Sequence, residues 1–155
     1  MRLSDHFTLA EMCKSQTAAR RGIDQTPPAD AIEALRKLCD GVLERVRIEF
    51  GIPIIPSSGY RSPELNRAIG GANNPQSQHC TGAAVDFEIA SIPNVDVARW
   101  ISQQCRFDQI ILECYDPKAG PNSGWIHVSY VDWPDARGDI LTYSRTNGYT
   151  PGLPV

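Results

Sequence analysis

An aspartate stands in the middle of an otherwise apolar segment, residues 83–89. Apolar and charged residues alternate there, which is typical of a β-strand with Val85 on one face and Asp86 and Glu88 on the other. A buried carboxylate in such a strand needs a cation, a metal or several hydrogen-bond donors. The segment therefore predicts a strand whose aspartate has a specific charged or polar partner.

Helical and strand-like patterns alternate around this strand. A capping box predicts a helix start at Thr8, and a loop is expected from there to residue 28. Helices are predicted over residues 29–50, 62–70 and 94–104, with Asn94 as the last helix's cap. Further strands are predicted over residues 52–58, 109–114 and 125–130, with a small addition at 140–143.

These patterns predict an α+β fold: one compact domain in which a small, mainly antiparallel sheet packs with helices. A chain of 155 residues fits one such domain. We expect residues 1–155 to form it, with a motif-bearing core at about 8–131 and a C-terminal tail at 132–155.

Composition excludes several classes of function. The formal net charge of −3 argues against duplex nucleic acid as a partner, because such proteins usually carry a basic excess. No apolar run approaches the roughly 18 residues of a membrane span. The first residues have no apolar signal-peptide region, so we expect a cytoplasmic protein or one released without a signal. None of the five cysteines forms a C-x-x-C pair, which disfavours a cysteine zinc site.

Two histidines could join Asp86 in a metal site. His127 lies inside a predicted strand, and His79 ends a polar loop seven residues before the aspartate. An odd separation would place His79 on the opposite face of a continuous strand, but Gly82 permits a bend. Two imidazoles and one carboxylate would make a three-ligand zinc site with an open position. A core His–Asp hydrogen bond beside an unrelated histidine is the alternative.

A longer pattern resembles a known family. Residues 58–66 read SGYRSPELN, glycines follow at 70–71, residues 77–86 read SQHCTGAAVD, and WIHV stands at 125–128. This pattern is similar to the zinc D-Ala-D-Ala carboxypeptidases and L-alanyl-D-glutamate endopeptidases of peptidoglycan, whose wider group includes the Hedgehog signalling domain. The resemblance extends to about residue 130 and implies a Hedgehog/DD-peptidase-like fold.

The resemblance also implies roles for individual residues. It implies that His79, Asp86 and His127 are zinc ligands, and that Arg61 holds a substrate carbonyl or carboxylate and stabilises the oxyanion. It further implies Ser77 and Trp125 as substrate-binding residues. Taken alone, Arg61 would be read as an exposed turn residue.

The general base departs from the family pattern. Many relatives carry a glutamate three residues before the last histidine, where this chain has Gly124. A carboxylate from elsewhere must then take the proton from water. Glu113, at the end of a predicted strand, is our first candidate, although it could also turn to solvent. Glu88 is the second candidate and Asp116 the third.

The predicted activity is zinc-dependent hydrolysis of amide bonds in peptidoglycan stem peptides, either at D-Ala-D-Ala or at an L-Ala-D-Glu-type bond. A phage endolysin is the expected setting, cytoplasmic until released or associated with the virion, with phage virion proteins as partners. The alternative is a catalytically inactive, Hedgehog-like zinc binding module or a structural virion component. The glycine at position 124 is its main support.

Overall fold

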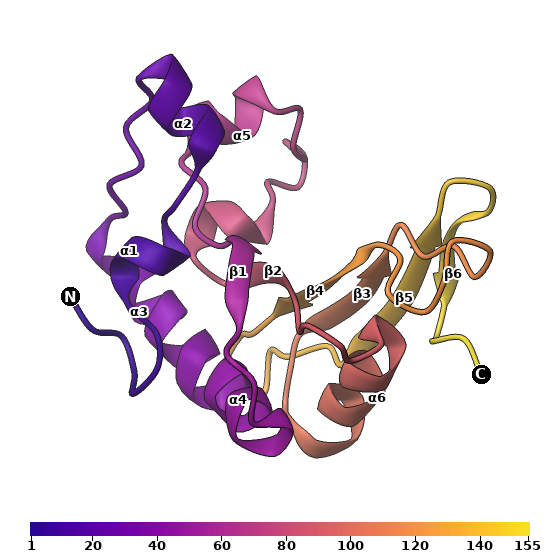
Figure 1. Cartoon of the computed structure of the whole chain (residues 1–155). Coiled ribbons are helices and arrows are strands. Elements are labelled where there is room, and N and C mark those ends of the chain that lie inside the picture. The colour runs from indigo at the N-terminus through magenta and orange to yellow at the C-terminus, as the bar shows by residue number, and fades with distance from the viewer.

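The computed structural model describes all 155 residues, as helices packed on a single sheet (Figure 1). The helical segments are α1 (Leu9–Met12), α2 (Gln16–Arg21), α3 (Ala29–Leu38), the π-helical turn η1 (Cys39–Leu43), α4 (Glu44–Phe50), α5 (Pro63–Ala68), the 3₁₀ helix η2 (Gln78–Thr81) and α6 (Asn94–Gln104). The strands are β1 (Ile55–Ser58), β2 (Ala84–Glu88), β3 (Gln109–Glu113), β4 (Trp125–Ser129), β5 (Asp139–Ser144) and β6 (Gly148–Pro151).

The six strands lie in the order β1-β2-β4-β3-β5-β6. Every neighbouring pair is antiparallel except β3 and β5, which run parallel. The predicted α+β fold with a mainly antiparallel sheet is therefore confirmed. None of the helices has the length and apolar character that crossing a membrane requires.

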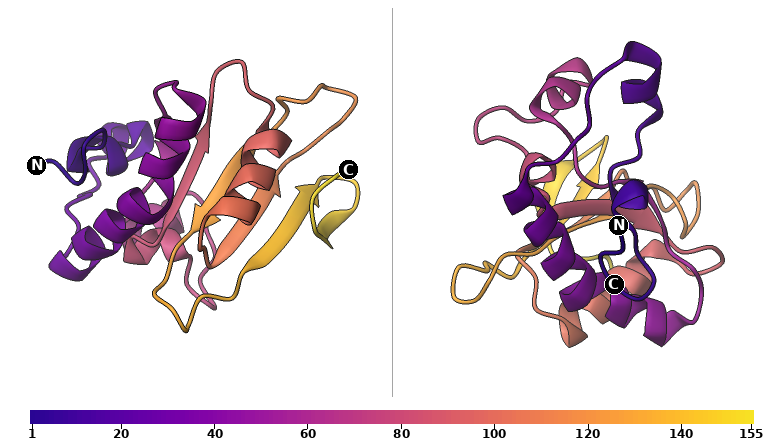
Figure 2. Two further views of the ribbon diagram at one scale, coloured as in Figure 1. Left: turned by 90° about the horizontal axis from the view of Figure 1, so that it is seen from below. Right: turned by 90° about the vertical axis from the view of Figure 1, so that its left-hand side faces the viewer.

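The sheet has one covered face and one face that carries polar groups. Alternate residues of the central strands are fully buried in the hydrophobic core, among them Val85, Phe87, Ile126, Val128 and Ile110. The long helical segment α3–η1–α4 supplies the other side of this core, and α6 packs on β3 and β4 (Figure 2). The intervening residues of β2, β3 and β4 point to the opposite face, where the candidate site lies.

Local signals in the sequence explain most element boundaries. The Thr8 and Glu11 side chains form the expected capping box, and Ser62 caps α5 ahead of Pro63. Residues 29–50 are helical throughout, with a π turn in the middle, and Gly51 ends the segment in the left-handed conformation.

Two local predictions were wrong. Residues 16–21 form helix α2, capped by Ser15, where a loop was expected; the helix is too short to show a clear apolar period. Asn94 does not cap α6. Its side-chain amide instead donates to Glu88 Oε1 and to the carbonyl oxygens of Ser123 and Gly124, at 3.2–3.4 Å.

The C-terminal residues belong to the sheet. The small strand expected at 140–143 is longer, Asp139–Ser144, and forms a hairpin with β6. An ion pair between the buried Asp108 and the half-exposed Arg137 fixes the approach to this hairpin: the Arg137 guanidinium donates to both oxygens of Asp108, at 2.7–3.2 Å. Gln78 also donates to Asp108, at 2.9 Å, which connects this region to η2.

Candidate metal centre and its cleft

Asp86 and His127 meet because their strands pair directly. They are partners in the antiparallel β2–β4 register, so their side chains leave the same face of the sheet. Nδ1 of His127 lies 2.9 Å from Oδ1 of Asp86. The sequence predicted both strands and left open whether their two side chains meet.

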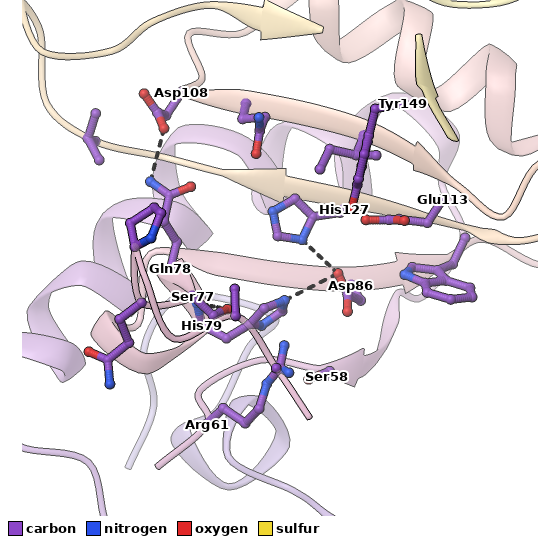
Figure 3. A pocket seen from close by; sticks show the side chains of 18 of the residues that line it. Ser58, Arg61, Ser77, Gln78, His79, Asp86, Asp108, Glu113, His127 and Tyr149 are labelled. Carbon is purple, nitrogen blue, oxygen red and sulfur yellow. Dashed lines mark hydrogen bonds and ion pairs between the residues drawn. The ribbon is translucent and has the colours of Figure 1, made fainter. Parts of the chain in front are cut away.

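His79 reaches the same carboxylate from outside the sheet. It lies in η2, and Gly82 ends that helix with a φ of +77°, which gives the bend the sequence predicted. Nε2 of His79 lies 3.4 Å from Oδ1 of Asp86, and the two imidazole rings lie 5.2 Å apart, edge to face (Figure 3). One 3₁₀ helix and two strands thus bring three polar side chains close together.

A second contact fixes the orientation of the His79 ring. Its Nδ1–H donates to the carbonyl oxygen of Gly59, at 2.7 Å, which leaves Nε2 as the nitrogen with a free lone pair. Gly59 itself packs against helix α1, where a Cβ would lie 2.2 Å from the carbonyl oxygen of Met12. Position 59 of the sequence pattern must therefore be a glycine, because the backbone of α1 lies too close to leave room for a side chain.

The electrostatics of this cluster favour an ionised aspartate. Burial opposes ionisation of Asp86, but its interactions with the side chains of His127 and His79 outweigh that effect and hold the pKa of Asp86 well below its usual range. Both histidines are at least nine-tenths buried. The three ligand atoms lie within 4.8 Å of one another, so the group can hold a metal ion. Two imidazoles and a carboxylate are a ligand set that suits zinc.

Arg61 lies beside this group, and its guanidinium has no partner within the protein. Its side chain forms no hydrogen bond or ion pair, and Nε is buried without a partner. Burial lowers the pKa of Arg61, while the charge of Asp86 raises it. Gly71 makes room for this arrangement, since a Cβ there would lie 3.0 Å from an Arg61 terminal nitrogen and 1.9 Å from Asn66 Oδ1. A planar guanidinium without a protein partner can donate hydrogen bonds to an oxygen of a bound ligand.

The three candidate bases lie in different surroundings. Glu113 lines the cleft together with His127 and Asp86, whereas neither Glu88 nor Asp116 lines it. Burial raises the pKa of Glu113, His127 lowers it and Asp86 raises it, with a net upward shift. Glu88 is exposed and accepts a hydrogen bond from Asn94. Asp116 is exposed in the loop after β3.

Gly124 occupies a position that excludes a side chain. Its φ is +72°, and a Cβ there would lie 1.7 Å from the carbonyl oxygen of Glu113. The glutamate that many relatives carry at this position therefore cannot fit on this backbone. Glu113, which pairs with Trp125 in the β3–β4 register, presents a carboxylate on the face that carries His127.

Comparison with known proteins agrees with this geometry. The family model described as peptidase M15 matches residues 5–129, which is most of the chain. The chain belongs to the peptidase M15 family. The resemblance to a family of peptidases that the sequence indicated is thereby confirmed, and with it the prediction of an enzyme.

One solved structure is similar in part. It is a mutant of the vancomycin resistance D,D-pentapeptidase VanY from the VanB-type resistance cassette, in complex with Zn(II), at 22% sequence identity. The alignment covers 68% of this chain and 73% of that chain, with a TM-score of 0.37. No curated protein matches the chain.

The remaining predicted residues of this M15 chain also line the cleft. Ser77 caps η2, where its hydroxyl accepts from the His79 amide at 3.3 Å, so its observed contact is with the loop backbone. Trp125 is half-buried on the face that carries Glu113.

Sequence reasoning missed several cleft residues, among them Asp108, Arg137 and Tyr149. Tyr149 of β6 lines the cleft, yet it lies 20 residues beyond the end of the M15 match. Its only signal in the sequence was an aromatic next to a glycine in a stretch without clear periodicity.

Proposed function

We propose that this M15 peptidase is zinc-dependent and hydrolyses amide bonds in peptidoglycan stem peptides. The observation that carries the proposal is the convergence of a three-residue ligand group, an unpaired arginine and a carboxylate of raised pKa in one cleft. The resemblance of residues 58–86 to peptidoglycan peptidases supports the class of substrate.

In this proposal His79, Asp86 and His127 hold the zinc ion. A zinc ion there supplies a Lewis acid and lowers the pKa of the water that it coordinates. The Gly59 carbonyl keeps Nε2 of His79 directed at the site, and the carboxylate of Asp86 supplies the negative charge of the ligand set. Both histidines are buried and Asp86 is partly buried, which limits competition by bulk water.

Arg61 and Glu113 act on the substrate in this proposal. The guanidinium of Arg61 donates to the carbonyl oxygen of the bond to be cut and stabilises the negative charge that develops there. Glu113 takes the proton from the attacking water and delivers it to the leaving amine. A pKa raised by burial suits this role, because it brings the carboxylate closer to neutral pH. Ser77 and Trp125 are proposed to contact the peptide from the walls of the cleft.

The inactive binding module is less well supported. Its argument was the missing glutamate at position 124, and a second carboxylate, that of Glu113, among the residues that line the cleft supports hydrolysis instead. A binding module would require neither that carboxylate nor an unpaired arginine.

Digestion of purified peptidoglycan tests the proposed function. Wild-type protein loaded with zinc should release stem-peptide fragments, and mass spectrometry of their new termini identifies whether D-Ala-D-Ala or an L-Ala-D-Glu-type bond is cut. Intact stem peptides after prolonged incubation would contradict the proposal.

A setting in phage-type lysis is part of the proposal and rests on the resemblance. In that setting the protein acts as an endolysin or with virion proteins, and reaches the wall after release. Protein added to permeabilised bacteria should lower the turbidity of the suspension, whereas unchanged turbidity would argue for a different setting.

A further inference from the structure

Tyr149 extends the functional face of the sheet beyond the segment that the M15 model matches. In the hairpin register Tyr149 pairs with Tyr143, and β5 runs alongside β3, the strand of Glu113. Tyr149 lines the same cleft as Glu113 and His127 (Figure 3). The C-terminal hairpin therefore adds a wall to the cleft.

The ring of Tyr149 is held in place by its neighbour. The centroids of the Tyr143 and Tyr149 rings lie 4.7 Å apart, a separation typical of a cross-strand aromatic pair. Tyr143 is tied to the sheet in turn, because its carbonyl oxygen accepts from the Tyr115 amide at 3.0 Å. Such support pre-organises the side chain for contact with a ligand.

The hydroxyl of Tyr149 is free to bind a ligand. The residue is 59% exposed, and its hydroxyl makes no hydrogen bond within the protein. Burial and the charge of Glu113 raise the pKa of Tyr149, so the hydroxyl stays protonated at neutral pH and can donate. Figure 3 shows Tyr149 and Arg61 on opposite sides of the Asp86 and His127 pair.

We propose that Tyr149 is a substrate-binding residue, whose hydroxyl donates a hydrogen bond to a backbone carbonyl of the stem peptide on the Glu113 side of the cleft. This inference rests on the proposed function. Arg61 and Tyr149 then hold the peptide from opposite sides of the metal group. A peptide carbonyl is an acceptor without charge, which a neutral phenol can satisfy without the desolvation cost of a second buried cation.

Steady-state kinetics on a synthetic stem pentapeptide test this role. Tyr149→Phe removes only the hydroxyl, and should raise KM about threefold to tenfold with kcat within about twofold of wild type. Tyr149→Ala also removes the ring and should raise KM further. Thr150→Ser is the control for the hairpin itself, since Thr150 is the next residue of β6, does not line this cleft, and donates through its hydroxyl to the Thr142 carbonyl oxygen, a bond that serine can keep. It should leave both constants and the melting temperature nearly unchanged.

The outcomes separate this inference from the proposed function. If wild type cleaves the pentapeptide and Tyr149→Phe has the same KM, or loses kcat alone, the binding role is wrong while the proposed function stands. If wild type binds the pentapeptide without cleaving it, the Kd from calorimetry replaces KM in the same comparison. If wild type neither cleaves nor binds it, both fail.

Discussion

Nδ1 of His127 and Oδ1 of Asp86 lie 2.9 Å apart because the two residues are direct partners on antiparallel strands. The geometry of the candidate metal centre thus depends on strand register. A slip of one residue would turn one of the two side chains into the hydrophobic core. His79, held by the Gly59 carbonyl, completes the group from a loop.

Removal of His127 should abolish metal binding and hydrolysis together. His127→Ala takes away one of three ligands, so zinc should fall from about one ion per chain to a small fraction after dialysis. Elemental analysis measures this directly. His6→Ala is the matched control, because His6 pairs with Glu44 outside the cleft and should leave the zinc content unchanged. If His127→Ala still binds zinc tightly, His127 is not a zinc ligand and the assignment is wrong.

Arg61→Lys should slow hydrolysis without affecting the fold. Lysine keeps the charge but loses the planar pair of donors, and we expect kcat/KM to fall by about tenfold or more. Zinc content and melting temperature should stay near wild type, since Arg61 makes no hydrogen bond within the protein. Unchanged kcat/KM on stem peptides would return Arg61 to the role of an ordinary turn residue.

A side chain at position 124 should destabilise the protein. Gly124→Ala places a Cβ against the Glu113 carbonyl at a positive φ, and should cost at least about 2 kcal/mol of unfolding free energy. Gly51→Ala, at a φ of +67° with nothing within 4 Å of its Cβ, isolates the backbone strain and should cost only about 1 kcal/mol. Gly124→Glu should not increase activity. If urea unfolding shows that Gly124→Ala and Gly51→Ala lose the same unfolding free energy, the contact with the Glu113 carbonyl does not contribute to the loss.

The ion pair between Arg137 and Asp108 should make stability depend on acid pH. Burial opposes ionisation of Asp108, but hydrogen bonds from Arg137 and Gln78 outweigh it and lower its pKa to about 2. Because the folded pKa lies below the unfolded value of about 3.9, the contribution is present above about pH 4 and is lost as pH falls through about 2.

Arg137→Ala should therefore lower the unfolding free energy by on the order of 1 kcal/mol at pH 7. The difference from wild type should shrink as the pH falls from 4 towards 2, in urea unfolding of metal-free protein. Lys37→Ala, which removes an exposed ion pair with Asp132, should have a smaller effect. A difference that stays constant with pH would show that Arg137 acts through packing.

The sequence predicted those parts of the structure that local pattern determines. The alternation around Asp86 predicted β2, the strand of His127 followed from the same period, and Gly82 predicted the bend that brings in His79. Which strands pair is a long-range property, and so is the packing that buries Arg61 beside Asp86. The same limit applies to Gly124, because only the β3 backbone shows why a side chain is excluded there.

The C-terminal residues were the least predictable part. Strand β5 pairs in parallel with β3, and nothing in a short, weakly periodic segment indicates such a partner. The position of Tyr149 in the cleft therefore could not be predicted from the aromatic residue next to a glycine that the sequence shows. Helix α2 was missed for a similar reason, since six residues do not establish a helical period.

The role of Glu113 decides whether the cleft is catalytic. Burial raises its pKa, so kcat/KM should rise with pH as this carboxyl ionises, with a midpoint above the usual range for glutamate. Glu113→Gln keeps the size and hydrogen bonding of the side chain but cannot take a proton. Glu88→Gln is the matched control, since Glu88 is exposed and does not line the cleft.

The most direct measurement compares wild type, Glu113→Gln and Glu88→Gln on purified peptidoglycan, at equal zinc content, by mass spectrometry of newly formed termini. We predict cleaved stem peptides with wild type and Glu88→Gln, and a rate lower by a factor on the order of 100 or more with Glu113→Gln. Full activity of Glu113→Gln, or loss of activity in Glu88→Gln alone, would contradict the assignment of the base. No cleavage by any of the three would contradict hydrolysis itself.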